Sequence, residues 1–229
     1  MLCDDGSTDN TYEVARQNQE THPNIKLIRN SENCGLNITL NNCLRLTEGE
    51  YVARMDGDDV SLPMRFEKEV QFLDEHPEFA FVSCPIIFFD ENGEFGRGKA
   101  IPIPQIRDFE KKSPFCHPSC MVRKSVYLEV GGYTESKWLI RNEDYNLWAK
   151  IYAKGYKGYN LPEYLYALRD DLNSARRRTF RGRINGVYSR WLAYRTLRFS
   201  FWGLCKYTVL SLVKGMLPIA YISPSIDGR

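Results

Sequence analysis

The chain has 229 residues, of which 43% are hydrophobic and 26% are charged. These fractions are close to globular averages and exclude both a disordered chain and a protein with several membrane spans. The length allows one substantial domain with a hydrophobic core, and a small appendage. The cysteines are odd in number, seven, and widely scattered, which favours reduced thiols in a cytosolic protein over a disulfide framework.

The net charge of +2 is unevenly distributed along the chain. Residues 172–226 contain eight arginines, two lysines and no acidic residue, which gives +10 locally and, by difference, about −8 elsewhere. Opposite charges of this kind predict two surfaces with different partners. We therefore expect a mildly acidic domain over residues 1–170 and a basic, aromatic helical extension over residues 171–229.

The first two thirds of the chain alternate strand-like and helix-like segments, which predicts an α/β layer architecture. In chain order we expect a helix over 9–20, a strand over 25–28, a helix over 36–47, a strand over 51–55, a helix from 61 to about 76, strands over 79–84 and 86–90, a hairpin turn over 91–94, a loop over 96–118 and a helix over 143–154.

Two of the expected helices have informative side chains. Ser61 is the expected N-cap of the third helix, which carries Phe66, Val70 and Leu73 on one face. In the helix over 143–154, the side chains expected to point inward are Leu147, Trp148 and Ile151.

Three carboxylates stand in the four residues Asp56-Gly57-Asp58-Asp59, directly after an expected strand. They repel one another unless a cation or a hydrogen-bond network compensates them. The carboxyl end of a strand is where α/β sheets bind ligands, and carboxylate oxygens suit Mg²⁺ or Mn²⁺. A metal site is therefore one interpretation of this loop, and a solvated acidic turn before a helix is the other.

Two further acidic clusters also begin expected helices. The segment over 4–10 contains Asp4 and Asp5, which could accept hydrogen bonds from a nucleobase or ribose, or could belong to a simple helix cap. Glu143 and Asp144 begin the helix over 143–154, where a carboxylate is either a partner of the helix dipole or a general base.

His117 lies between Cys116 and Cys120, a combination that suggests zinc. The spacing matches no common zinc motif, and the sequence has no second Cys/His pair to complete a site. We expect His117 to line a ligand pocket or to be packed in the core.

The order of the motifs resembles that of the family 2 glycosyltransferases. The resemblance covers about residues 2–169 and rests on six segments: DDGSTDNT, NCGLNITLNNCL, GEYVARMDGDD, LPMRFEKEV, HPSCMVRKSVYLEVGGY and NEDYNLWAKIYAKGYKGYNLPEYLYALR. It implies the A-type nucleotide-diphospho-sugar transferase fold, a mostly parallel mixed sheet flanked by helices. It also implies inverting, metal-dependent transfer of one sugar from a nucleoside-diphosphate sugar to an acceptor hydroxyl.

The resemblance assigns roles to individual residues. Asp144 matches the catalytic base, and Asp58 and Asp56 match the Asp-x-Asp motif, with Asp58 binding Mn²⁺ or Mg²⁺ and Asp56 contacting the ribose side. Asp4 or Asp5 matches the aspartate that holds the nucleobase. The full set expected to bind the nucleotide sugar is Asp4, Asp5, Asp56, Asp58, Asp59, Glu143 and His117.

The sequence departs from the family pattern at two places. The family normally has a strand, a helix and most of a second strand before the DDGS segment, so we expect residues 1–170 to form an N-terminally truncated catalytic domain that binds nucleotide sugar. A non-catalytic remnant that binds nucleotide sugar or membrane is the alternative function. Processive members carry Gln-x-x-Arg-Trp, whereas Val187 stands where the Gln would precede Arg190-Trp191, so we expect addition of a single sugar.

The basic extension suggests a membrane partner. Its apolar stretch over 199–222 is interrupted by Lys206 and Lys214 and is a poor bilayer span. Cationic, aromatic helices over 174–222 suit the surface of an anionic membrane, with a helical cap or an oligomer contact as the alternative. We expect a cytoplasmic enzyme, peripheral on the inner face of the plasma membrane, that uses a UDP-sugar and a saccharide or lipid-linked acceptor in surface polysaccharide or glycolipid synthesis, without nucleic acid.

Overall fold

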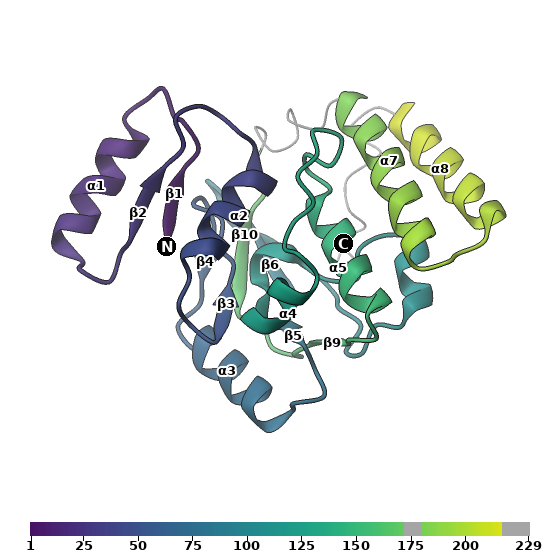
Figure 1. Cartoon of the computed structure of the whole chain (residues 1–229), viewed down its shortest axis with the longest axis horizontal. Helices are drawn as coiled ribbons and strands as arrows, with labels where there is room; N and C mark the ends of the chain where they lie inside the picture. The colour runs from purple at the N-terminus through teal and green to yellow at the C-terminus, as the bar shows by residue number, and fades with distance from the viewer. Residues whose placement is uncertain (172–179, 217–229) are drawn as a thin grey trace.

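The computed structural model describes residues 1–171 and 180–216 (Figure 1). Residues 172–179 and 217–229, which include parts of the predicted basic extension, lie outside the described residues. The helices are α1 (Thr11–Thr21), α2 (Leu36–Leu46), α3 (Arg65–Glu75), α4 (Lys124–Glu129), α5 (Glu143–Ala153), α7 (Phe180–Thr196) and α8 (Phe201–Met216), and the 3-10 helices are η1 (Ile106–Glu110) and η2 (His117–Ser119).

The strands form three sheets in the described part of the chain. Their bounds are β1 (Leu2–Asp4), β2 (Leu27–Arg29), β3 (Tyr51–Ala53), β4 (Val60–Ser61), β5 (Phe81–Ser83), β6 (Ile86–Asp90), β7 (Gly93–Arg97), β8 (Met121–Arg123), β9 (Gly158–Asn160) and β10 (Tyr166–Arg169). The orders are β1-β2, β4-β10-β6-β7 and β3-β8-β5-β9. The pairs β1–β2, β6–β10 and β5–β9 are parallel, and the pairs β4–β10, β3–β8, β5–β8 and β6–β7 are antiparallel.

The sheet β3-β8-β5-β9 is buried on both faces, because alternate side chains of its strands enter two different cores. Phe81 and Val122 belong to the core beneath α5, whereas Val82 and Met121 belong to the core beneath α3. This alternation is the period of two that a strand imposes on its side chains. Helices therefore cover both faces, as the α/β prediction requires.

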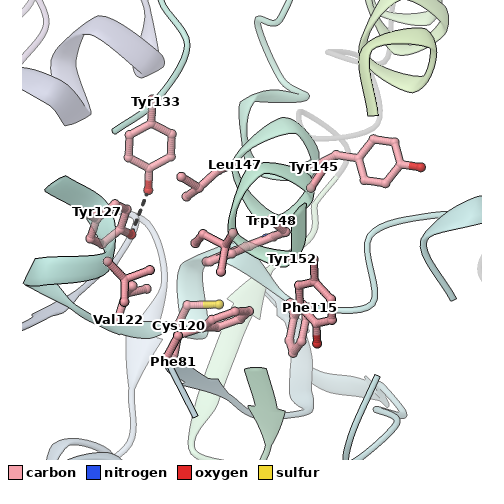
Figure 2. Close-up of a cluster of buried hydrophobic side chains, with 14 of the residues drawn as sticks. Phe81, Phe115, Cys120, Val122, Tyr127, Tyr133, Tyr145, Leu147, Trp148 and Tyr152 are labelled. Atoms are coloured by element: carbon pink, nitrogen blue, oxygen red, sulfur yellow. Dashed lines mark hydrogen bonds between the residues drawn. The ribbon is translucent and has the colours of Figure 1, made fainter. Parts of the chain in front are cut away.

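The larger core is built around Trp148 of α5 (Figure 2). Its indole stacks on Phe81 with ring centroids 4.4 Å apart, and Phe115 packs against both rings. Leu147, Trp148 and Ile151 are fully buried, which confirms the predicted inward face of this helix. Phe115 and the equally buried Phe109 anchor the segment predicted as a loop over 96–118, which contains η1 and begins η2.

The prediction for the start of the third helix was wrong. Ser61 lies in β4, where it pairs with Tyr166, and α3 begins four residues later with Met64 at the N-cap position. The buried face of α3 consists of Arg65, Glu69 and Leu73, whereas the predicted face residue Phe66 is exposed. Tertiary pairing with β10 explains the shift, because it holds Val60 and Ser61 in an extended conformation, and the Leu62 N–H donates to the Leu165 carbonyl.

The described part of the basic extension consists of α7 and α8 (Figure 1). α7 packs along α5, and α8 packs against α7 and η1 at the edge of the molecule. Within the described residues, none of the helices combines the length and the apolar character needed to cross a bilayer.

Candidate active site

The acidic loop follows β3 directly and leads into β4. One carboxylate oxygen of each of Asp56, Asp58 and Asp59 lies within 4.8 Å of the others, with Asp58 exposed, Asp56 half-buried and Asp59 buried. Three oxygen donors at this separation fit a hard divalent cation such as Mg²⁺ or Mn²⁺. The remaining coordination positions of such a cation would be open to water or phosphate oxygens.

Asp59 ties the acidic loop to β10. Its Oδ2 accepts a hydrogen bond of 2.8 Å from the Tyr166 hydroxyl, and its Oδ1 accepts one of 2.8 Å from the Arg169 backbone N–H. The Tyr166 hydroxyl also accepts a hydrogen bond from the Asp56 backbone N–H. Burial raises the pKa of Asp59, and the charges of Asp56 and Asp58 raise it further against these hydrogen bonds. Asp59 and Tyr166 therefore anchor the acidic loop to β10.

Arg54 places a buried positive charge next to the acidic loop. Its side chain is only 7% exposed, and its guanidinium forms an ion pair with Asp56. Its backbone is fixed by hydrogen bonds to Cys120 and from Arg65. The Arg54 Nε is buried without a hydrogen-bond partner among the described residues. The positive charge of this buried guanidinium offsets part of the repulsion among the carboxylates of the acidic loop.

Glu143 and Asp144, at the start of α5, lie within the electrostatic reach of Arg54. Burial, followed by the neighbouring charge of Asp144, raises the pKa of Glu143 to about 7, while the charge of Arg54 opposes the rise. Burial also raises the pKa of Asp144, against a hydrogen bond from the Tyr145 backbone and the charge of Arg54. The Glu143 Oε2 is buried and has no hydrogen-bond partner among the described residues.

The segment before these carboxylates is held by α7. Asn185 donates a 3.3 Å hydrogen bond to the Ile140 carbonyl, and Ser189 donates one of 3.1 Å to the Asn142 carbonyl. Arg141, between Ile140 and Asn142, has a φ of 68°, a left-handed conformation that is uncommon for a residue other than glycine. The helical extension thus fixes the backbone at the start of α5.

His117 is packed in the core. Its Nε2 lies 2.7 Å from the Tyr133 hydroxyl, and its ring meets the edge of Trp148. Burial, followed by the positive charge of Arg54, lowers the pKa of His117 well below 6.5, so the imidazole is neutral at neutral pH. His117 was expected either to line a ligand pocket or to be packed in the core, and the structure shows it packed in the core. It lies within the electrostatic reach of Arg54.

Asp4 and Asp5 form their contacts within the segment from β1 to α2. Asp4 pairs with Arg29 at 3.0 Å, and Asp5 accepts hydrogen bonds from Asn30 and from the backbone N–H groups of Cys34 and Gly35. Desolvation would raise the pKa of Asp5, but these hydrogen bonds outweigh it and lower the pKa.

The turn after Asp5 requires glycine. Gly6 has a φ of 70°, and a Cβ there would lie 2.6 Å from the Glu32 carbonyl carbon. The first cluster is therefore a rigid turn that fixes both carboxylates.

The structure brings two of the predicted clusters to one buried charge. Asp56 pairs with Arg54, and Arg54 acts electrostatically on Glu143, Asp144 and His117. Such an arrangement offers oxygen donors that suit a divalent cation at one position and carboxylates able to accept a proton at another.

The sequence analysis missed Arg54, Tyr166 and Arg169. One signal was available for Arg54, a charged residue at the end of an otherwise apolar strand and directly before an acidic loop. Tyr166 and Arg169 offered none, because their role depends on β10 pairing with β4.

The family of the chain follows from comparisons with known proteins. The family described as glycosyl transferase family 2 matches residues 1–131. The putative glycosyltransferase EpsE of Bacillus subtilis (strain 168) is 37% identical over 224 residues, which cover 97% of this chain and 80% of that protein. The chain belongs to glycosyltransferase family 2, and the predicted resemblance and enzyme class are confirmed.

Two other similarities extend over nearly the whole chain. The UDP-Gal:alpha-D-GlcNAc-diphosphoundecaprenol beta-1,3-galactosyltransferase of Escherichia coli is 27% identical over 225 residues, 96% of this chain and 81% of that protein. The structure of the mannosyltransferase PcManGT from Pyrobaculum calidifontis, in complex with GDP-Man and Mn²⁺, aligns with a TM-score of 0.61 at 20% identity over 96% of this chain and 67% of that one. The shared fold confirms the predicted α/β class.

Proposed function

We propose that this chain catalyses the inverting, metal-dependent transfer of a single sugar from a nucleoside-diphosphate sugar to an acceptor hydroxyl. The observation that carries the proposal is the pair of acidic clusters around Arg54. The loop of Asp56, Asp58 and Asp59 has the donor set for a divalent cation, and the start of α5 has two carboxylates with raised pKa values. One cluster serves the leaving group and the other serves the attacking hydroxyl.

In this proposal Asp58 and Asp56 hold Mn²⁺ or Mg²⁺. The bound cation would offset the negative charge that gathers on the departing nucleoside diphosphate. Arg54 fixes Asp56 through their ion pair, and Asp59 holds the loop on β10. With the loop fixed in advance, little reorganisation is needed when the donor binds.

Asp144 acts as the general base in this proposal. It takes the proton of the acceptor hydroxyl while the acceptor oxygen bonds to the anomeric carbon and the bond from that carbon to the diphosphate oxygen breaks. Attack opposite the leaving group inverts the anomeric configuration. Glu143, with its buried and unpartnered Oε2, is available to hydrogen-bond a sugar hydroxyl. Proton transfer of this kind contributes roughly 10²–10⁴-fold to a rate.

The donor and the acceptor are proposed from the relatives. The E. coli relative is named for a UDP-sugar and a lipid diphosphate acceptor, and the mannosyltransferase holds GDP-Man and Mn²⁺. We infer a UDP-sugar and a saccharide or lipid-linked acceptor, with surface polysaccharide or glycolipid synthesis on the inner face of the plasma membrane as the setting. Asp4 and Asp5 would border the nucleobase, while Asp59 and His117 would support the pocket through Tyr166 and Tyr133.

A thermal-shift measurement with UDP and Mn²⁺ tests the proposal. Ligand that binds only the folded state at about 100 times its Kd stabilises by roughly 2.7 kcal/mol, so the melting temperature should rise by several degrees. Asp58→Asn should lose the Mn²⁺-dependent part of the shift, whereas Asp90→Asn, in the β6–β7 hairpin, should keep it.

Two outcomes would contradict the proposal. Full Mn²⁺-dependent activity in Asp58→Asn would remove the metal assignment. A stably folded chain that shows no shift with any nucleoside diphosphate would favour the alternative, a non-catalytic remnant of such an enzyme.

A further inference from the structure

The outer side of α8 is largely apolar. Trp202 is 80% exposed, Phe201 68%, Val209 58% and Leu210 45%. Trp202 and Val209 are seven residues apart and share one face of the helix, with Lys206 between them and Phe201 and Leu210 at its borders. We call these five residues the outer face of α8. A surface helix ordinarily turns its polar face to water, whereas α8 exposes four large apolar side chains beside Lys206.

The inner side of α8 is fixed by packing. A Cβ on Gly203 would lie 3.2 Å from Tyr194 and 3.4 Å from Glu110, so this side of the helix meets α7 and η1. Arg190 of α7 also donates a hydrogen bond to the Tyr207 carbonyl. The outer face therefore cannot turn inward without breaking these contacts, and Figure 1 shows α8 on the far side of α7 from the sheets.

The charges near this face select among possible partners. The segment from α7 to α8, residues 180–216, contains no acidic residue, and Arg195 on α7, Arg198 in the turn and Lys206 on α8 are exposed. A second copy of the chain would bring two basic surfaces together at a cost in repulsion. An anionic lipid surface attracts the same charges, and Trp and Phe beside Lys suit the boundary between headgroups and acyl chains.

We infer that the outer face of α8 docks this protein on a lipid bilayer that carries anionic headgroups. α8 lies along the surface, Trp202 and Phe201 enter the boundary between headgroups and acyl chains, and Lys206 lies at the level of the phosphates. Docking does not depend on the proposed reaction.

The consequence for catalysis does rest on the proposed function. α8 packs on α7, and Asn185 and Ser189 of α7 hold the backbone before Glu143 and Asp144. Docking would therefore keep the end of α5 that carries the base close to the bilayer, where a lipid-linked acceptor is found.

Vesicle co-sedimentation of the full chain tests the docking. The protein should bind phosphatidylcholine vesicles that contain about 30% phosphatidylglycerol, bind pure phosphatidylcholine weakly, and dissociate at high salt. Phe201→Ser with Trp202→Ser should weaken binding by at least roughly tenfold, because two large apolar side chains lose their burial. Lys206→Glu should weaken it by roughly fivefold or more.

Matched controls separate docking from general stickiness and from misfolding. Phe66→Ser removes an exposed aromatic ring on α3, and Lys157→Glu reverses an exposed charge distant in sequence from α8, so both should bind vesicles like the parent chain. Brominated lipids should quench the tryptophan fluorescence of the parent protein more strongly than that of the Trp202→Phe variant. The shift with UDP and Mn²⁺ should persist in the α8 variants, so failure of donor binding and failure of docking are distinguishable.

Three results would overturn the inference. These are the absence of salt-sensitive vesicle binding, vesicle binding unchanged by the Phe201/Trp202 double substitution, and concentration-dependent dimerisation without lipid that this double substitution abolishes. The last result would mean that a second copy covers the outer face.

Discussion

Arg54, Glu143 and Asp144 are electrostatically linked: the charge of Arg54 lowers the pKa of both carboxylates, and the charge of Asp144 raises the pKa of Glu143. Burial is the largest influence on both carboxylates, and the Arg54 guanidinium opposes it. A carboxylate whose pKa approaches neutrality is a better proton acceptor than an ordinary exposed one. These two carboxylates are therefore the best-placed proton acceptors of the described site.

Asp144→Asn tests the base assignment. The substitution keeps the size of the side chain but removes the proton acceptor, so turnover should fall by roughly 10²–10⁴-fold while nucleotide affinity stays unchanged. Sugar transfer at saturating donor and UDP binding by calorimetry measure the two quantities. If the substitution instead lowers UDP affinity with little loss of turnover, Asp144 has a structural role.

Glu143→Gln should change how stability depends on pH. The pKa of Glu143 is raised from 4.5 to about 7 in the folded state, so the folded state favours the protonated form. The parent should therefore lose stability as the pH rises from about 4.5 through 7, by on the order of 3 kcal/mol at about 1.4 kcal/mol per pKa unit.

Chemical denaturation across this pH range provides the measurement. Gln cannot ionise, so Glu143→Gln should be more stable than the parent above pH ~7 and nearly equal to it below pH ~4.5. Glu91→Gln, in the exposed β6–β7 turn, is the control and should follow the parent curve. Parallel curves for the parent and Glu143→Gln would contradict the raised pKa.

At the scale of elements, α3 contributes a buried ion pair that supports the acidic loop. Arg65 and Glu69 are both fully buried, with Arg65 Nε 3.1 Å from Glu69 Oε1. The guanidinium also donates to the Arg54 carbonyl at 3.0 Å and lies over the Tyr166 ring. Arg65 thus contacts two of the residues that position Asp56 and Asp59.

Arg65→Met should destabilise the protein by about 3–5 kcal/mol, because it leaves the Glu69 charge buried without its partner. The double variant Arg65→Met with Glu69→Met removes both charges and should be more stable than the single variant. Denaturant unfolding of the parent, Arg65→Met and the double variant measures the three free energies of unfolding. A double variant no more stable than Arg65→Met would show that the loss comes from packing and backbone contacts.

At the scale of the whole molecule, the two oppositely charged parts of the chain meet at α5. The acidic part supplies the carboxylates, and the basic extension supplies Asn185 and Ser189, which hold the backbone before them. The predicted extension is thus hydrogen-bonded to the backbone carbonyls of Ile140 and Asn142, just before the candidate base. Its outermost helix carries the exposed aromatic residues, so one end of the extension orders the site while the other is available to a partner.

The sequence by itself determined the family, the α/β class and the positions of the acidic clusters. These are local properties: Asp56, Asp58 and Asp59 stand within four residues, and Leu147, Trp148 and Ile151 recur at the helical period. Helix α5 and strand β6 were predicted within one residue of their observed ends for the same reason.

Only the tertiary structure decided how the clusters are held and connected. Arg54 pairs with Asp56 and acts electrostatically on Glu143 and Asp144 because folding brings the end of β3 within reach of the start of α5. Ser61 joins a strand because β10 pairs beside it. Arg65 and Glu69 are buried because they pair with each other, although their polarity predicts exposure. The first two arrangements link residues distant in sequence that meet only on folding. Arg65 and Glu69 are one helical turn apart, so for them the tertiary structure decides burial, and their pairing lowers its cost.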